Sequence, residues 1–190
     1  MRSPKSGKKL VYISEDLLNN ISEISKKKGE SITKYIEDLL EQAVRIDRLG
    51  FRSEDLADIL EVIHVQRTLG GTFVPLDVLN SAIDTGSNGL SEKWYESGRL
   101  YGRYLKARFN DPVNVLKLLL RVMRWDLNEV DAVQECHSVA IRCVSTSLTK
   151  AGAASLSKFI EGAMHGMGYR TECEESMKGI VICSFRAEDA

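Results

Sequence analysis

Basic side chains crowd the start of the chain, where they could neutralise the charge of a bound anion. Arg2, Lys5, Lys8 and Lys9 all precede the first acidic residue, Glu15. The charge of the whole chain predicts no such partner, because 26 Lys and Arg residues nearly balance 27 Asp and Glu residues. The segment before Lys8 is polar. It is either a basic arm that reaches a phosphate or a minor groove, or an ordinary solvated terminus.

An alternating segment follows these basic residues. Lys8, Leu10 and Tyr12 fall on one face of an extended chain, and Val11 and Ile13 fall on the other. The alternation predicts a short strand, which is not stable alone because its backbone groups lack partners on both edges. No second strand follows nearby, so the simplest partner is the same strand of a second copy. The resulting antiparallel ribbon fits the major groove of DNA.

Two short helices are predicted after the strand. Ser14 is a suitable N-cap for the first helix, Gly29 a natural end, and Ser31 a suitable N-cap for the second helix. The apolar positions are Leu17, Leu18, Ile21 and Ile24 in the first helix, and Ile32, Ile36, Leu39, Leu40 and Ala43 in the second. Neither stripe can be buried within a segment this small, so a second copy of the chain would cover both.

Residues 8–45 resemble the ribbon-helix-helix DNA-binding domains of the CopG, Arc and MetJ type. The resemblance rests on the basic KK, the alternating LVYIS, the cap S-E-D and the G-E-S turn before the second helix. It implies that Lys8, Leu10 and Tyr12 of both copies enter the major groove and contact bases. Lys9 then falls on the inward face, so the alternative is a register shifted by one residue, which would swap the two faces.

The same resemblance implies that a DNA phosphate is held at the N-terminus of the second helix. Backbone N–H groups there would do most of the binding, because they point at the anion and the helix dipole favours it. With the basic arm included, the residues expected to contact phosphates are Arg2, Lys5, Lys9, Ser31, Ile32, Thr33 and Lys34.

The rest of the composition is that of a soluble globular protein, with 43% hydrophobic and 28% charged residues, and the 190 residues allow one to two domains. No apolar run is long enough to span a membrane, and no secretory signal is present. The four cysteines, Cys136, Cys143, Cys173 and Cys183, form no C-x-x-C pair, which fits a reducing compartment. We therefore expect a cytoplasmic, nucleoid-associated protein.

The pattern of elements predicts an α+β fold in three parts. Residues 1–50 form the ribbon-helix-helix module, residues 51–71 a linker helix, and residues 72–190 a C-terminal domain of helices and a small antiparallel sheet. Within the helix predicted for residues 91–109, Gly98 and Gly102 stand one turn apart and lower helix propensity. This pair indicates close approach either by another element, in tight helix packing, or by a ligand.

Residues 70–187 resemble the 4-vinyl reductase domain, which is related to the Bet3-like fold. The matching words are ESGRLYG, KFIEGAMHGMGY and ECEESMKGIVICSF. The resemblance implies an apolar pocket, and the residues expected to line it are Trp94, Tyr101, Tyr104, Phe159 and Met164, each of which is equally a candidate for the core. Some relatives bind zinc through cysteines. Cys173, Cys183 and Glu175 are ligands by type, but Glu175 replaces the first family cysteine, so we assign no metal or cofactor.

These features predict a dimeric transcriptional regulator that binds double-stranded DNA and responds to a small hydrophobic ligand. Pairing of dimers into tetramers is left open. The alternative is a DNA-binding protein whose C-terminal domain serves only oligomerisation or partner binding, as in an antitoxin or a chromatin-associated protein. An enzyme is not expected, because the chain has no nucleotide-binding glycine loop and no paired-histidine metal motif. Cys136 and His137 are neighbours on a predicted strand and so would face opposite sides.

Overall fold

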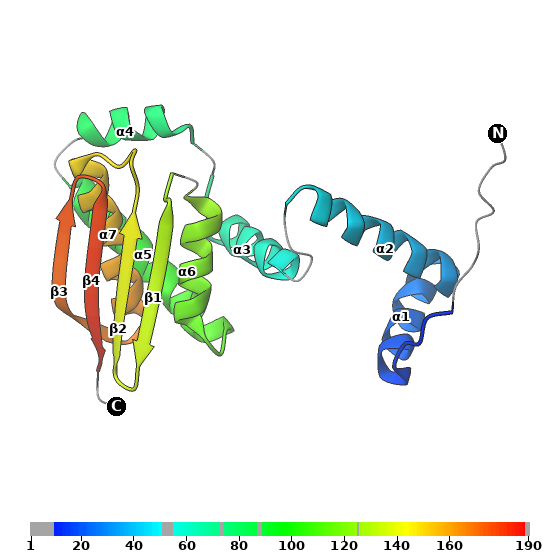
Figure 1. The fold of residues 1–190 in the computed structure, drawn as a ribbon. Helices are drawn as coiled ribbons and strands as arrows, with labels where there is room; N and C mark the ends of the chain where they lie inside the picture. Colours follow the sequence, from blue (N-terminus) through cyan, green and yellow to red (C-terminus); the bar gives the residue numbers. More distant parts are fainter. Residues whose placement is uncertain (1–9, 51–54, 73, 87–88, 125, 189–190) are drawn as a thin grey trace. The chain divides into compact units, whose positions relative to one another are not determined.

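The computed structural model describes residues 10–50, 55–72, 74–86, 89–124 and 126–188. The described residues form seven helices and one four-stranded antiparallel sheet, which confirms the α+β class (Figure 1). The chain divides into two compact units, Met1–Leu56 and Ala57–Ala190.

The first unit contains two helices joined by a tight turn. Helix α1 (Glu15–Lys28) ends at Gly29, whose φ of 71° lies in the left-handed region, as predicted for a helix-ending glycine. Helix α2 (Ile32–Arg48) begins after Ser31, and the Ser31 side chain accepts a hydrogen bond from the Lys34 backbone N–H. Ser14 stands at the N-cap of α1 but its side chain makes no capping bond, so only its position was predicted correctly.

The second unit holds the other helices and the sheet. Their bounds are α3 (Asp55–Leu69, which starts at the unit boundary), α4 (Leu76–Asp84), α5 (Leu90–Arg108), α6 (Pro112–Met123), β1 (Glu129–Glu135), β2 (Ser138–Val144), α7 (Lys150–Met167), β3 (Tyr169–Met177) and β4 (Ile180–Ala187). The strand order is β1-β2-β4-β3, with antiparallel neighbours throughout. None of the described helices combines the length and apolarity needed to cross a bilayer.

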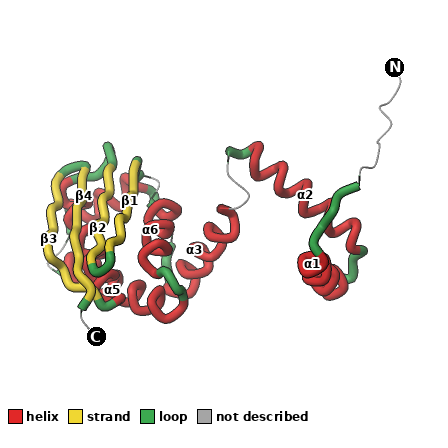
Figure 2. Tube along the Cα trace, turned by 60° about the horizontal axis from the view of Figure 1, so that its bottom comes forward, coloured by secondary structure: helices red, strands yellow, loops and turns green. Residues whose placement is uncertain are grey.

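Alternation along the strands sets the inner face of the sheet. In β4, Val181, Cys183 and Phe185 are fully buried, while their neighbours are exposed or half-buried. Helices α5 and α7 lie on this inner face, as the two views show (Figures 1 and 2). Cys136 and His137 were expected on a strand but form the turn between β1 and β2, because the pairing of Glu135 with Ser138 leaves two residues to reverse the chain.

Helix α3 is part of the C-terminal core over its second half. Val62 and Val65 are fully buried among the residues of that core, and Leu69 packs against it. The helix predicted as a linker therefore contributes side chains to the C-terminal unit.

Helices α5 and α7 cross with their backbones in close contact. A Cβ atom on Gly98 would lie 2.0 Å from the Phe159 carbonyl oxygen, and one on Gly102 would lie 1.9 Å from the Ala163 carbonyl oxygen. Helix α7 contributes the reciprocal glycine, because a Cβ on Gly162 would lie 2.0 Å from the Tyr95 carbonyl oxygen. Tight helix packing, one of the two explanations offered for the glycine pair, is confirmed.

Candidate functional site

The N-terminal unit presents the residues expected at a nucleic acid. Arg2, Lys5, Lys8 and Lys9 lie outside the described residues. Leu10 and Tyr12 are 79% and 91% exposed. Over residues 10–14 the described chain forms no strand ladder, so the backbone there has no strand partner within one copy.

The same unit leaves an extensive apolar surface uncovered. Helix α2 has no buried residue, and in α1 the only buried apolar side chain is that of Ile21. The exposed large apolar residues of the unit, besides those of the extended segment, are Leu17, Leu18, Ile24, Leu39, Leu40, Val44 and Leu49. Exposed apolar residues in this number on two short helices are typical of a surface used for protein contacts.

Positive charge gathers at the turn between α1 and α2. Lys26, Lys27 and Lys28 occupy the last turn of α1. The ammonium of Lys28 lies 4.8 Å from the centroid of the Tyr35 ring, which ties this cationic end to the start of α2. Lys34 is exposed in the first turn of α2. The N-terminus of α2, where Ser31 already accepts from the Lys34 N–H, therefore has cations close by, and both the helix dipole and these cations favour an anion.

The C-terminal unit contains a pocket of about 340 Å³. Its lining is mostly apolar and comes from α3 to α7 and from Gly71, Thr72, Val74 and Arg124. The described lining residues are Gln66, Gly71, Thr72, Val74, Leu79, Trp94, Ser97, Tyr101, Leu119, Leu120, Met123, Arg124, Leu156 and Phe159. Three residues expected from the sequence, Trp94, Tyr101 and Phe159, meet here. The other two are not among the lining residues: Met164 is fully buried in the core and Tyr104 packs half-buried against it.

Aromatic rings form one wall of the pocket. Phe159 contacts Tyr101 and Trp94 edge-on, with ring centroids 5.4 Å and 6.4 Å away. The Tyr101 hydroxyl donates to Gln66 Oε1 at 2.8 Å, and burial raises the pKa of Tyr101. The Trp94 indole Nε1–H is buried and has no hydrogen-bond partner among the described residues. Because this N–H has almost no accessible surface, it lies inside the packed wall and is not open to the pocket.

The one basic side chain among the described lining residues is already neutralised. Arg124 Nε and Nη2 donate to Asp126 Oδ1 and Oδ2, both at 2.8 Å, and the Asp126 side chain is only 6% exposed. This bidentate pair leaves no free charge for an anionic ligand. The lining therefore suits an uncharged, largely apolar molecule.

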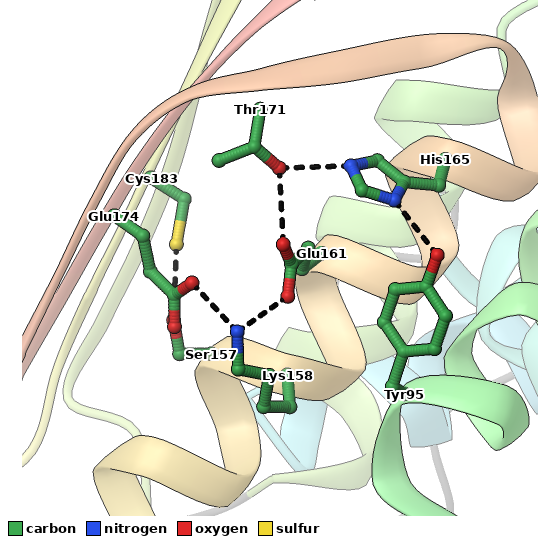
Figure 3. A network of polar contacts seen from close by, with 8 residues as sticks. All are labelled: Tyr95, Ser157, Lys158, Glu161, His165, Thr171, Glu174 and Cys183. Carbon is green, nitrogen blue, oxygen red and sulfur yellow. Dashed lines mark hydrogen bonds and ion pairs between the residues drawn. The ribbon is translucent and has the colours of Figure 1, made fainter. Parts of the chain in front are cut away.

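A chain of hydrogen bonds runs beside the core on the side of β3 (Figure 3). Tyr95 Oη lies 2.9 Å from His165 Nδ1, and His165 Nε2 lies 2.8 Å from Thr171 Oγ1. Thr171 Oγ1 donates to Glu161 Oε1 at 3.4 Å. Since the only hydroxyl hydrogen of Thr171 goes to Glu161, His165 Nε2 is the donor to Thr171. In the neutral imidazole, Nδ1 then accepts from Tyr95.

The chain continues through two carboxylates and a lysine. Lys158 Nζ donates to Glu161 Oε2 at 2.7 Å and to Glu174 Oε2 at 2.9 Å, and the hydrogen bond to Glu161 is the main cause that raises the pKa of Lys158. Ser157 Oγ donates to Glu174 Oε1 at 2.8 Å and lies 3.3 Å from Cys183 Sγ. Because the Ser157 hydrogen is committed, Cys183 must be the donor in that last contact.

The state of Cys183 agrees with this assignment. Burial raises the pKa of the Cys183 thiol to about 11, so the thiol keeps its proton at neutral pH. A protonated, buried thiol is a poor nucleophile and a poor metal ligand. The network therefore clamps α5 and α7 to the sheet through paired groups and presents no activated nucleophile at Cys183.

The cysteines near the C-terminus that could serve as metal ligands do not lie on the same face of the sheet. Cys173 is paired across the sheet with Ser184 and is exposed, whereas Cys183, the neighbour of Ser184, is buried on the opposite face. Cys173 and Cys183 therefore do not share an ion. Within the described ranges, no group of three or more His, Cys, Asp and Glu residues is arranged to hold a metal.

The four thiols are expected to divide into two classes of reactivity. Cys136 and Cys173 are exposed, whereas burial raises the pKa of Cys143 to about 12 and that of Cys183 to about 11. At pH 8, a chromogenic disulfide reagent should modify the first pair rapidly and the second pair only after unfolding. Mass mapping of the labelled peptides checks the assignment. Rapid labelling of Cys183 in the folded protein would contradict its burial and its raised pKa.

Comparisons with models of protein families, with curated proteins and with solved structures found no match. The functional argument therefore rests on the residues and their geometry.

Proposed function

We propose that the chain is a dimeric, sequence-specific DNA-binding transcriptional regulator of the ribbon-helix-helix type. One observation carries the proposal. The N-terminal unit has an extended segment without a strand partner, with Leu10 79% and Tyr12 91% exposed, next to two helices whose apolar residues are largely uncovered. A second copy supplies both missing partners at once, because the segments pair as a two-stranded ribbon and the helix faces bury one another.

The ribbon then presents its outward side chains to DNA. Lys8, Leu10 and Tyr12 lie at alternate positions and so share one face of the ribbon, which the resemblance to ribbon-helix-helix domains places toward the DNA. Tyr12 and Lys8 provide hydrogen bonds to base edges, and Leu10 packs against thymine methyl groups. A phosphate binds at the N-terminus of α2, where Lys34 adds positive charge.

The C-terminal unit supplies the response in this proposal. A volume of about 340 Å³ lies in the range of small-molecule sites, and most of the lining is apolar. The ligand is an uncharged, largely hydrophobic molecule, since Arg124 is already paired with Asp126.

Replacing Lys8 and Tyr12 by alanine should weaken binding to a selected operator by roughly tenfold or more, because good base contacts each contribute about 1–3 kcal/mol. The fold should persist, because Tyr12 is 91% exposed. Fluorescence anisotropy titrations against an operator selected from random duplexes measure the effect. Unchanged affinity would refute the assignment of the reading side chains.

Lys34→Ala is the matched comparison for that experiment. It removes a phosphate contact, so it should weaken binding to all duplexes alike and reduce the salt slope of binding by about one. Lys93→Ala, on the C-terminal unit, is the control for loss of an exposed lysine.

A further inference from the structure

Helix α3 connects the two units in sequence and also lines the pocket. It begins at Asp55, beside the unit boundary at Leu56, and its residues Val62 and Val65 are fully buried in the C-terminal core. Gln66, one residue further on, contributes its side chain to the pocket. Displacement of Gln66 therefore acts on the helix that follows the DNA-binding unit.

Gln66 is held by the aromatic wall. Tyr101 is 6% exposed and gives its single hydroxyl hydrogen to Gln66 Oε1 at 2.8 Å. The chain at Gly71 passes against this pair, because a Cβ there would lie 1.5 Å from Gln66 Oε1 and 3.1 Å from Tyr101 Oη. The Gly71 N–H also donates to the Gln66 carbonyl oxygen at 2.8 Å, which closes the end of α3. The side chains of Tyr101 and Gln66 thus pack together with the end of α3 at the pocket.

A ligand with an acceptor atom competes for the same hydrogen. If it takes the Tyr101 hydroxyl, Gln66 Oε1 loses the hydrogen bond that holds its side chain to α5. The Gln66 side chain and the Gly71 backbone packed against it are then no longer fixed by Tyr101, so the end of α3 can readjust. A ligand without an acceptor leaves the bond intact.

We propose that the hydrogen bond from Tyr101 to Gln66 is the contact through which the occupied pocket changes the affinity of the N-terminal unit for DNA. The inference rests on the proposed function and adds its regulatory element. The bond breaks when the ligand engages Tyr101, α3 shifts or loosens at its C-terminal end, and the DNA-binding unit that precedes α3 responds. Couplings of this kind change affinity by roughly 5–150-fold.

The test breaks the bond without any ligand. In the full chain, Tyr101→Phe removes the hydroxyl and keeps the ring. Tyr104→Phe makes the same change on the same helix at a residue outside the pocket lining. Anisotropy titrations use a duplex selected by the wild type from a random library, and hydrogen exchange follows the amides of residues 59–66. Tyr101→Phe should change DNA affinity by at least fivefold and speed exchange in α3, whereas Tyr104→Phe should change neither.

Two further variants keep the test decisive. Gln66→Met removes the bond from the other side and replaces Tyr101→Phe if that variant fails to fold. The variant that carries both Tyr101→Phe and Gln66→Met should have the same DNA affinity as either single variant, because each substitution removes the same hydrogen bond. A wild type that selects no duplex refutes the proposed function and the inference with it. A wild type that selects a duplex which Tyr101→Phe and Gln66→Met bind with unchanged affinity refutes the inference alone, even if α3 exchanges faster.

Discussion

Gly102→Ala should destabilise the C-terminal unit by about 3 kcal/mol, although the same change stabilises an isolated helix by about 1 kcal/mol. The added methyl would lie 1.9 Å from the Ala163 carbonyl oxygen, so the α5 and α7 backbones must separate. Their separation also opens the core around Leu105 and Ile160, which are fully buried. Gly102→Val should prevent folding of this unit altogether.

Gly152→Ala is the control for that prediction. It makes the same change in α7, where the nearest atoms to the added methyl are side-chain atoms of Thr149 and Leu148 at 3.2 Å and 3.3 Å. Its stability should stay within about 1 kcal/mol of the wild type. Denaturant unfolding followed by tryptophan fluorescence reports on the right unit, because Trp94 and Trp125 both lie within Ala57–Ala190. A stabilised Gly102→Ala protein would show that α5 and α7 do not cross as described.

Replacing Leu40 and Val44 together by glutamate should abolish both dimerisation and DNA binding. The two side chains are 60% and 51% exposed in one copy and lie one turn apart on α2, so a second copy would bury them. Four carboxylates would then enter a paired apolar surface, and each buried unpaired charge costs about 3 kcal/mol or more. DNA affinity should fall by roughly a hundredfold or more.

Gln42→Glu separates this effect from a simple gain of negative charge. Gln42 is exposed on α2 between the two substituted positions, and at about 100° per residue it points to the far side of the helix. The Gln42→Glu protein should remain a dimer in sedimentation equilibrium experiments, and its affinity for DNA should fall only modestly. A Leu40→Glu, Val44→Glu protein that remains dimeric would place the contact between copies elsewhere.

Local signals explain why much of the fold could be predicted from the sequence. Gly29 and Ser31 mark the turn between α1 and α2, and both take the backbone geometry that their residue types favour. Gly98 and Gly102 predicted a close approach because glycine lowers helix propensity and is retained where a side chain does not fit. The inward residues of β4 followed from simple alternation.

The candidate site depended on contacts that no local pattern encodes. Gln66 and Tyr101 are 35 residues apart, and Tyr95 and His165 are 70 apart. Both pairs meet only once α3, α5 and α7 have packed. Met164 is apolar like the pocket residues and lies on the same helix as Phe159, but it is fully buried in the core, because α7 buries a wide apolar face. Composition alone does not separate lining from core.

The central claim is that two copies pair through the extended segments before α1. A mixed sample of isotope-labelled and unlabelled full chain tests it most directly, by nuclear Overhauser effects filtered to report only contacts between copies. Backbone contacts between residues 10–13 of one copy and the same residues of the other, in antiparallel register, are the predicted result. A monomer in solution whose residues 10–13 contact only their own chain would contradict the account.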